Sequence, residues 1–439
     1  MNEFTSTEEL YKVFLDSNQS ISTDTRNLKG GSIFFALKGA NFNGNNFAVK
    51  AIEEGCSWAI VDEPEFAAFK NVLLVKDTLK ALQDLSKFHR EKLNIPVIGI
   101  TGSNGKTTNK ELIHAVLSKK YNTYATLGNL NNHIGVPLTL LSITSEHEMA
   151  IVEMGANHQG EIAELSSIAQ PDFGLITNIG KAHLEGFGGE EGVKKGKGEL
   201  FNYIRKTNGK VFVNCDDPVL MELSEGIGKY SYGEKCSADV HGEFHSNSEF
   251  VEFKWSVKGK SLNDAPLVKT QMFGHYNFIN LLCAACIGNY FDVPQEDINL
   301  ALQTYHPEMN RSQMVRTEKN TVILDAYNAN PSSMQLAIDN FSKQLLSDKI
   351  VILGDMFELG DYSEQEHLKV LNQLNALGNI KPILVGEHFF SLQNQFTNFR
   401  FFRSTSEVIT FLKDEKINSS NILIKGSRGM KLEKVVDFL

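Results

Sequence analysis

The sequence is poor in several residue types, and each scarcity narrows what the chain can be. Its 439 residues include two tryptophans, ten prolines and five cysteines. No stretch approaches the ~18 to 20 apolar residues that cross a bilayer. The acidic N-terminus has neither the basic start nor the small-residue cleavage pattern of a secretory signal. We therefore expect a cytoplasmic protein with no membrane partner, made of about two to four domains.

Positive charge is also scarce. Lysine and arginine total 43 against 53 acidic residues, which gives a net charge of −10. A protein that binds nucleic acid in general is more often basic, so this class loses support and we expect no nucleic-acid partner. Any anionic ligand must instead be held by local positive groups and backbone amides.

The few cysteines do not indicate a disulfide framework. They are odd in number and scattered at positions 56, 215, 236, 283 and 286 of a long chain. Cys283 and Cys286 have the spacing of a redox or metal pair, but they lie in the apolar run 281–287 without a second Cys or His pair. We expect both to be small buried residues of a helix.

What the sequence does contain is a glycine-rich phosphate-binding motif, IGITGSNGKTT, at residues 98–108. The apolar run before it predicts a buried strand. Gly102 and Gly105 permit a tight backbone path that points successive N–H groups at phosphate oxygens. Lys106 can then reach the β- and γ-phosphates, and the Thr107 hydroxyl can bind magnesium. Ser103, Asn104 and Thr108 are expected to complete this nucleotide site.

A helix is expected directly after the motif. Residues 107–119 place apolar side chains on one helical face, so the positive helix end would lie at the phosphates. One detail departs from the general phosphate-loop pattern, because Ile100 stands where that pattern has glycine. An ordinary glycine-rich turn is the alternative, and the run from Lys106 to Thr108 disfavours it.

The chain divides into three ranges, 1–94, 95–307 and 308–439, in which short apolar runs alternate with helical patterns. The clearest strand patterns lie at 32–37, 57–61, 72–75, 150–153, 173–177, 321–325, 350–353, 382–385 and 422–424. Helical patterns in the third range lie at 333–346, 363–377, 405–415 and 429–438. Short buried strands between amphipathic helices predict an α/β fold with doubly wound, mostly parallel sheets.

Polar residues follow two of the central strands. Glu153 ends an apolar strand, where a second carboxylate of a phosphate site would hold magnesium. The alternative is a solvated carboxylate at a strand end. His183 follows the next strand, and both a functional and a structural role stay open because magnesium prefers oxygen ligands.

Several segments together resemble the Mur ligase family, and within it the branch that adds D-alanyl-D-alanine to UDP-N-acetylmuramoyl tripeptide. The phosphate loop has that family's form, GITGSNGKTT. The other segments are STDTR at 22–26, GSIFFALKG at 31–39, GNLNNHIGVP at 128–137, DAYNANPSSM at 325–334, LGDMFELG at 353–360 and KGSR at 425–428. The resemblance implies an N-terminal UDP-substrate-binding domain, a central ATP-binding domain of phosphate-loop type and a C-terminal Rossmann-like domain that closes over the nucleotide.

The resemblance also implies roles for individual residues. Lys106, His183 and Lys197 would be catalytic. The magnesium ligands would be Thr107, Glu153, His183 and Lys197. ATP would be bound by the loop from Gly102 to Thr108 and by Asn277, Asn280, Arg311 and Asp325. Substrate contacts would be Thr25 and Arg26 for UDP, Asn131 and Asn132 for the muramoyl peptide, and Asn328, Asn330 and Arg428 in the third domain. Arg428 would bind a peptide carboxylate with its guanidinium fork, the alternative being a solvated loop arginine.

Lys197 matches the position at which the family carries a carbamylated lysine. An uncharged lysine that adds carbon dioxide becomes an anion able to bind magnesium. A free ammonium would suit a dication site poorly. The alternative is that Lys194, Lys195 and Lys197 form a solvated helical face.

Five positions depart from the family's pattern. Asn43 and Asn45 replace an acidic residue and a histidine, and His133 replaces an acidic residue. Tyr276 stands where histidine is common, at the adenine side. Leu324 replaces one of two consecutive acidic residues, leaving Asp325 as the carboxylate there. None of these departures removes a phosphate or metal group.

The implied reaction is ATP-dependent amide formation through an acyl phosphate, by a monomeric enzyme with small-molecule substrates. Two alternatives stay open: a ligase of the same family with another amino-acid acceptor, and a phosphate-loop ATPase that acts as a switch. The sequence does not decide whether the third residue of the tripeptide is lysine or diaminopimelate.

Overall fold

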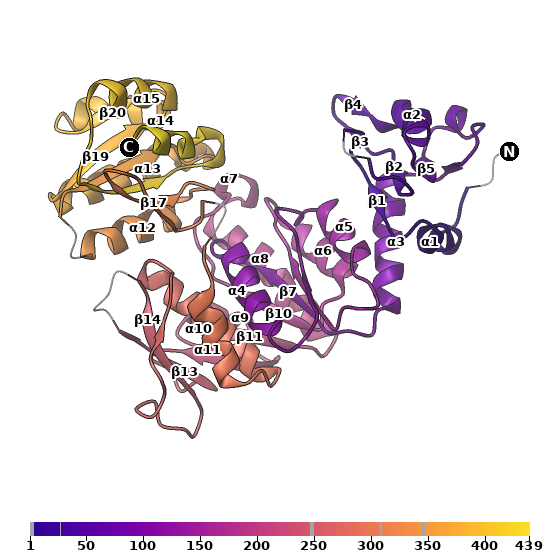
Figure 1. The fold of residues 1–439 in the computed structure, drawn as a ribbon, viewed down its shortest axis with the longest axis horizontal. Helices are drawn as coiled ribbons and strands as arrows, with labels where there is room; N and C mark the ends of the chain where they lie inside the picture. The colour runs from indigo at the N-terminus through magenta and orange to yellow at the C-terminus, as the bar shows by residue number, and fades with distance from the viewer. Residues whose placement is uncertain (1–3, 27, 246–249, 308–309, 345–346) are drawn as a thin grey trace.

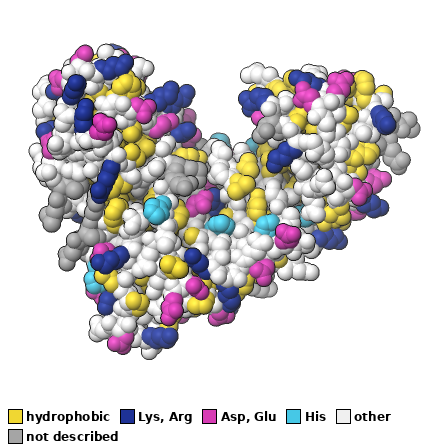
Figure 2. All heavy atoms as spheres, viewed as in Figure 1, with side chains coloured by type: hydrophobic (Ala, Val, Ile, Leu, Met, Phe, Trp, Pro, Cys, Tyr) yellow, Lys and Arg dark blue, Asp and Glu magenta, His cyan; other side chains and the backbone are white. Residues whose placement is uncertain are grey.

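The computed structural model describes residues 4–26, 28–245, 250–307, 310–344 and 347–439. They form three lobes, each built around its own main sheet (Figure 1). The N-terminal and C-terminal lobes both rise from the central lobe and face each other across a wide hollow (Figure 2). A ligand that reaches from one outer lobe to the other must therefore lie over the central lobe.

The N-terminal lobe is built on a parallel sheet in the order β1-β2-β5-β6. Its strands are β1 (Ile21–Ser22), β2 (Ile33–Phe35), β5 (Trp58–Val61) and β6 (Val72–Leu74), beside a hairpin of β3 (Lys38–Gly39) and β4 (Phe42–Asn43). Phe35 packs with α1 (Thr7–Asp16) and α3 (Thr78–Lys92), and Phe34 packs with α2 (Ala48–Glu53). These neighbours point to opposite faces because side chains alternate along a strand.

Helix α3 joins the N-terminal lobe to the central one. It packs against α5 (Gly135–Leu141) and α6 (Glu161–Ala169) of the central lobe. Arg90 on α3 pairs with Asp172 at 2.9 Å, and His89 hydrogen-bonds the Ile143 carbonyl at 2.8 Å. Burial lowers the pKa of His89. The domain boundary at 94/95 stays a prediction, since this helix belongs by its contacts to both lobes.

The central sheet has the order β15-β14-β13-β12-β11-β10-β7-β9-β8. The strands are β7 (Val97–Thr101), β8 (Thr123–Ala125), β9 (Met149–Glu153), β10 (Phe173–Ile176), β11 (Lys210–Asn214), β12 (Gly228–Gly233), β13 (Val240–His245), β14 (Glu252–Val257) and β15 (Val268–Lys269). The strands from β8 to β13 pair in parallel, whereas β13, β14 and β15 pair antiparallel. The mostly parallel sheet was predicted, and the antiparallel extension was not.

Helices cover both faces of the central sheet. One face carries α4 (Lys106–Leu117), α10 (His275–Tyr290) and α11 (Gln295–Thr304), which share a core with Ile98 and Ile100. The other face carries α5, α6 and α8 (Glu190–Lys206), which share a core with Val97. The short helices α7 (Leu184–Phe187) and α9 (Pro218–Leu223) follow strand ends. This doubly wound arrangement brings the carboxyl ends of β7, β9 and β10 to one edge.

The C-terminal sheet has the order β16-β17-β21-β18-β19-β20 and is parallel except at β16. The strands are β16 (Gln313–Arg316), β17 (Thr321–Asp325), β18 (Lys349–Gly354), β19 (Ile380–Val385), β20 (Arg400–Phe402) and β21 (Asn421–Lys425). The helices are α12 (Pro331–Lys343), α13 (Ser363–Leu377), α14 (Glu387–Ser391) and α15 (Thr405–Asp414).

The helices predicted in the third range are found with one change of type. The pattern at 333–346 corresponds to α12, and its residues 345–346 lie outside the described residues. The pattern at 429–438 was predicted as one helical stretch. The chain forms two 3-10 segments there, η5 (Arg428–Met430) and η6 (Leu432–Phe438), with Lys431 left-handed between them at φ 54°. Shorter 3-10 segments are η1 (Gly44–Phe47), η2 (Pro64–Phe66), η3 (Gly360–Tyr362) and η4 (Gln393–Gln395).

The cysteines meet expectation except for one pair. Cys283 and Cys286 are free, fully buried residues of α10, as predicted. No disulfide framework was predicted, and the described residues form one single disulfide, between Cys215 and Cys236, which the sequence did not indicate. Cys215 follows β11 and Cys236 follows β12, and these neighbouring parallel strands bring their carboxyl-end loops together. Spacing along the chain does not reveal such a pairing.

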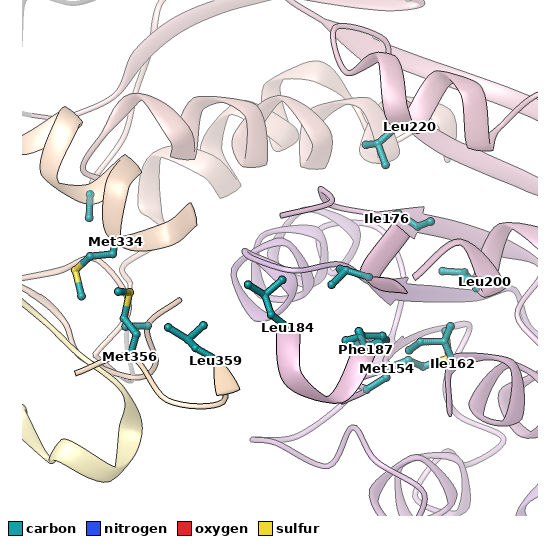
Figure 3. Close-up of a cluster of buried hydrophobic side chains, with 14 of the residues drawn as sticks. Met154, Ile162, Ile176, Leu184, Phe187, Leu200, Leu220, Met334, Met356 and Leu359 are labelled. Carbon is teal, nitrogen blue, oxygen red and sulfur yellow. The ribbon is translucent and has the colours of Figure 1, made fainter. Parts of the chain in front are cut away.

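The central and C-terminal lobes share one continuous hydrophobic core. Leu184 and Phe187 of α7 belong to the same buried cluster as Met334, Met356 and Leu359 of the C-terminal lobe (Figure 3). This seam fixes the C-terminal lobe against the carboxyl edge of the central sheet. Within the described part of the chain, every helix is too short or too polar to traverse a lipid bilayer.

Candidate active site

A cavity of about 530 Å³ lies at the carboxyl edge of the central sheet, where the C-terminal lobe meets it. It is lined by residues from the phosphate loop, from the segments after β8, β9 and β10, from the start of α10, and from the C-terminal lobe. The predicted site residues in its lining are Ser103, Asn104, Gly105, Lys106, Thr107, Thr108, Asn131, Asn132, Glu153, His183, Asn277, Asn280, Arg311, Asp325, Asn328 and Asn330. Residues that are far apart in sequence thus share one space.

The phosphate loop has the predicted strand, turn and helix. It runs from the end of β7 to the start of α4, and Gly105 precedes the helix at φ 75°. Gly102 lies beneath the loop at φ 142°, and a Cβ there would stand 2.0 Å from Thr177 Oγ1. Only glycine fits both conformation and space at Gly102. The first turn of a 12-residue helix therefore points its free N–H groups at the loop.

Lys106 folds back over this loop. Its Nζ donates to the Gly102 carbonyl at 2.7 Å and lies 3.4 Å from the Ser103 carbonyl. Burial lowers the pKa of Lys106, and nearby Glu153 acts in the opposite direction. The ammonium is thus already placed beside the backbone that would cradle phosphate.

Two residues after β10 brace the loop, and sequence reasoning missed both. Thr177 Oγ1 donates to the Asn104 carbonyl at 2.6 Å, and the Asn104 N–H donates to Asn178 Oδ1 at 3.1 Å. The signal was present, because Thr177 and Asn178 are polar residues at the end of an apolar strand, in the same string that drew attention to His183.

A buried polar chain joins the loop to the neighbouring strand. Thr107 Oγ1 donates to Glu153 Oε2 at 2.9 Å, and Asn131 Nδ2 donates to Glu153 Oε1 at 2.8 Å. Thr107 and Glu153 are 3% and 2% exposed. A hydroxyl and a carboxylate side by side are oxygen ligands of the kind magnesium prefers.

Thr107 and Glu153 fit as ligands of a magnesium ion that also binds a phosphate of the nucleotide. Among the described residues, no group of three or more His, Cys, Asp or Glu side chains converges to form a metal site of its own. Magnesium commonly takes one or two carboxylates and completes its shell with substrate phosphates and water. Thr107 and Glu153 supply such a partial shell beside the phosphate loop.

The start of α10 contributes an amide network next to the loop. Asn109 Nδ2 donates to Asn280 Oδ1 at 2.8 Å, and Asn280 Nδ2 donates to Asn277 Oδ1 at 2.9 Å. Tyr276, one of the departures, bonds Ser312 of the third range at 2.6 Å through its hydroxyl. Burial raises the pKa of Tyr276, so the phenol stays neutral. The substitution thus adds a link between the two lobes.

The C-terminal lobe presents charged groups to the cavity. Asp325 Oδ2 pairs with Lys425 Nζ at 2.6 Å, and Asp325 Oδ1 accepts the Ser312 N–H at 3.1 Å. The guanidinium of Arg311 lies 3.8 Å from the centre of the Tyr327 ring, a cation–π contact. Sequence reasoning missed Lys425 and Tyr327 as site residues, although both lie within the motifs that it quoted.

His183 and Lys197 come from the part of the chain that follows β10, at the start of α7 and within α8. His183 stands at the start of α7, and its Nδ1 is in contact with Glu358 Oε2 of the C-terminal lobe. Lys197 on α8 does not line the cavity. It is 1% exposed, and its Nζ donates to the carbonyl of Ala156, which does line the cavity, at 3.0 Å.

The solvated-face alternative for Lys197 is wrong, because the side chain is buried. Its Nζ lies 4.8 Å from the centre of the Phe187 ring. Burial, with a further contribution from Lys106, lowers the pKa of Lys197 well below its usual range. An uncharged amine is the form that reacts with carbon dioxide.

Three further predicted residues, Thr25, Arg26 and Arg428, are not part of the cavity lining. Thr25 and Arg26 belong to a turn after β1, where the exposed Arg26 guanidinium holds Asp24 at 2.7 Å and lowers the pKa of Asp24 to about 2. Arg428 begins η5, and its side chain is 59% exposed with Nη1 at 3.3 Å from Glu433. Its guanidinium lies 5.9 Å from the ring centre of Tyr327, which lines the cavity. The structure does not bring these three residues to the phosphate loop.

The other departures are accommodated locally. Asn45 is fully buried and exchanges two hydrogen bonds with Asp62, at 2.9 and 3.0 Å. Asn43 donates to Glu63 at 3.0 Å. His133 lines the cavity, and its carbonyl accepts from Gln83 on α3 at 3.2 Å. The two asparagines therefore order the loop around η1.

Comparisons with known proteins agree with this arrangement. Family models match in three consecutive parts: the Mur ligase family catalytic domain at residues 18–90, the Mur ligase middle domain at 100–288, and the Mur ligase glutamate ligase domain at 310–428. The chain is similar to the UDP-N-acetylmuramoyl-tripeptide–D-alanyl-D-alanine ligases of Bacillus subtilis (33% identical; 95% of this chain and 92% of the relative) and Escherichia coli (34% identical; 95% and 92%).

A solved structure, MurF from Acinetobacter baumannii, superposes with a TM-score of 0.86 at 32% identity, covering 97% of each chain. The sequence matches cover nearly the whole chain, and the superposition covers the whole three-lobed fold. Both agree with the family assignment that the phosphate loop and the cavity suggest. The chain belongs to the Mur ligase family.

Proposed function

We propose that this protein is the ATP-dependent ligase that joins D-alanyl-D-alanine to UDP-N-acetylmuramoyl tripeptide, a cytoplasmic step of peptidoglycan precursor synthesis. The observation that carries the proposal is that the phosphate loop, the Asn131–Asn132 segment and the 325–334 segment line one cavity. The Bacillus subtilis and Escherichia coli relatives bear this reaction in their names.

The chemistry follows from the low reactivity of a carboxylate toward an amine. Transfer of the γ-phosphoryl group of ATP to the terminal carboxylate of the tripeptide gives an acyl phosphate. The amine of D-alanyl-D-alanine then attacks its carbonyl carbon, and phosphate leaves from the tetrahedral intermediate. Lys106 would stabilise the charge that moves onto the phosphoryl oxygens, and the helix N-terminus would hold the phosphates.

Exclusion of water from the acyl phosphate is the task of the C-terminal lobe. Asn330 binds Asn104 of the phosphate loop at 2.8 Å, and the Lys181 N–H donates to Ser332 Oγ at 2.8 Å. These contacts hold the third domain against the place where the reaction would occur. A closed site also raises the strength of each electrostatic contact inside it.

The residues present fit magnesium, which when bound would offset the negative charge of the phosphates. Thr107 and Glu153 would hold the ion shared with ATP, and His183 and Lys197 would serve a second ion. We propose that Lys197 does so as a carbamate, because its buried amine lies directly behind the cavity wall at Ala156. A carbamate replaces a cation by an anionic oxygen ligand.

The hollow between the outer lobes suits a long substrate (Figure 2). The UDP end would bind the N-terminal lobe at Thr25 and Arg26, and the peptide would extend over Asn131 and Asn132 to the cavity. Arg428 and the asparagines 328 and 330 would receive the acceptor, with the guanidinium on its carboxylate. We propose a monomer, since the described residues of one chain supply every part of this site.

Acceptor-dependent phosphate release tests the proposal. We expect release of phosphate from ATP only with UDP-muramoyl tripeptide, and amide formation only when D-alanyl-D-alanine is added. Lysine-containing and diaminopimelate-containing tripeptides are compared side by side, which also identifies the third residue. Equal turnover with a single amino acid would point to another acceptor, and release of phosphate in the absence of both substrates would point to an ATPase switch.

A further inference from the structure

Glu358 of the C-terminal lobe meets His183 of the central lobe at the seam between them. His183 stands between β10 and α7, and Glu358 stands between β18 and η3. Ring nitrogen Nδ1 and carboxylate oxygen Oε2 are in direct contact. His183 is among the described residues that line the cavity, whereas Glu358 is not. The carboxylate therefore reaches the imidazole from the side of the C-terminal lobe.

The backbone on both sides of this contact is held in an unusual conformation. His183 has φ 53° and Glu358 has φ 62°, the left-handed region that residues with side chains rarely occupy. Such conformations persist only where the surroundings impose them. Here the next residues, Leu184 and Leu359, are each 2% exposed in the shared core (Figure 3). Packing of these leucines presents the two polar side chains to each other.

The contact determines which ring nitrogen carries the proton. A carboxylate only accepts hydrogen bonds, so Nδ1 must be protonated beside it. A neutral imidazole has one N–H, which leaves Nε2 with a free lone pair. Histidines that bind a metal are commonly oriented in this way by a carboxylate on the other nitrogen.

We propose that Glu358 is a positioning residue that fixes the Nδ1–H tautomer of His183. The ability of His183 to bind the second metal would thereby depend on docking of the third domain. This inference rests on the proposed function, in which His183 serves the second metal. When the C-terminal lobe moves away, His183 loses the partner that selects its tautomer. Amide formation would then be restricted to the closed arrangement, in which the acyl phosphate is shielded.

Nitrogen NMR of ring-labelled histidine tests the tautomer without any substrate. The His183 signals are assigned by their loss in His183→Gln and are read in the wild type, Glu358→Gln and Glu358→Ala at a pH where the imidazole is neutral. We expect the Nδ1–H form in the wild type, and a return toward the mixture of free histidine in Glu358→Ala. Glu358→Gln should lie between, because its amide oxygen still accepts from Nδ1.

Kinetics provide the second readout. Glu358→Ala should lower kcat by about 10- to 100-fold, the range for partners that orient a metal ligand, with KM for the UDP substrate unchanged. Glu366→Gln is the matched control. Glu366 accepts from Lys181 across the same seam at 3.2 Å, so this variant removes another contact between the lobes and should leave the tautomer of His183 unchanged.

Two results would overturn the inference: a His183 that keeps its Nδ1–H form in Glu358→Ala, or a control that causes the same changes. If the wild type forms no amide with D-alanyl-D-alanine, the proposed function fails. The tautomer measurement, which uses no substrate, still decides the role of Glu358.

Discussion

Asn330 of the C-terminal lobe donates from Nδ2 to Oδ1 of Asn104 in the phosphate loop, at 2.8 Å. The same Asn330 caps helix α12, because its Oδ1 accepts the Ser333 N–H at 2.9 Å. One side chain thus begins a helix of the third domain and docks that domain on the loop that would hold ATP. The two tasks use different atoms, so they can be separated by mutation.

Replacement of Asn330 should separate stability from turnover. Asn330→Ala removes both the helix cap and the hydrogen bond to Asn104. We expect it to lower the free energy of unfolding by about 1 kcal/mol and also to lower kcat. Asn330→Ser keeps a good cap but is too short to reach Asn104, so it should lower kcat at nearly wild-type stability. Denaturant unfolding and the acceptor-dependent assay measure the two effects. A serine variant with normal turnover would show that the Asn104 contact does not matter for catalysis.

Removal of the Lys106 ammonium should lower the rate without unfolding the protein. Loss of one preorganised group that stabilises charge typically costs about 100-fold or more in kcat, so Lys106→Ala should reach at least that loss. Lys119, an exposed residue after the same helix, provides the control. Thermal unfolding of both variants should stay close to wild type. Near-normal turnover in a folded Lys106→Ala protein would exclude the lysine from phosphoryl transfer.

Sequence patterns predicted the elements whose signal is local. The strand, turn and helix around Gly102 and Gly105 were found as expected, because backbone conformation there depends on glycine and on adjacent apolar runs. Glu153 was found beside Thr107 because parallel strands end at a common edge. The antiparallel strands β13 to β15 were missed, since their short alternating segments give a weak signal.

Local sequence patterns could not predict the contacts between lobes. Nothing in the neighbourhood of Asn104 indicates Asn330, and nothing around His183 indicates Glu358, because each pair depends on how two lobes dock. The disulfide between Cys215 and Cys236 was missed for a related reason, as strand order in the sheet brings the two together. Burial of Lys197 likewise follows from packing of α8, whereas its grouping with Lys194 and Lys195 had left a solvated face as the alternative.

Stability should fall as the pH drops through the range in which His89 titrates. Burial lowers the pKa of His89 in the folded protein, so the unfolded state binds its proton first, near pH 6.5. The contribution of neutral His89 to the free energy of unfolding is therefore fully present above that pH. It is lost as the pH falls through the folded-state pKa. The hydrogen bond affected is the one from His89 on α3 to the Ile143 carbonyl.

Melting temperatures of the wild type and His89→Gln, measured from pH 8 to pH 5, isolate this contribution. Burial also lowers the pKa of His275 and His367, so both proteins should lose stability in acid. The wild type should lose more, and the two curves should converge as the pH falls. Parallel curves would mean that His89 keeps an ordinary pKa.

Lys197 carries the most specific chemical prediction. If it becomes a carbamate that binds the second magnesium ion, Lys197→Ala should lose most activity and still bind ATP at the phosphate loop. Acetate or formate could enter the vacated space and restore part of the rate, because a short carboxylate supplies the missing oxygen ligand. A surface lysine could not be rescued in this way. Lys195→Ala, which removes an exposed lysine from the same helix, should stay fully active.

The rescue is measured by titrating carboxylate against the Lys197→Ala and wild-type enzymes at fixed ionic strength. Carbamate formation requires the neutral amine, and burial lowers the pKa of Lys197 in the direction that supplies it. Labelled carbon-13 dioxide should therefore give a carbamate signal in the wild type that is absent from the variant, and the signal should weaken as the pH falls and the amine becomes protonated. Full activity of Lys197→Ala without added carboxylate, or a wild type that takes up no label, would leave Lys197 as a buried structural amine bonded to Ala156.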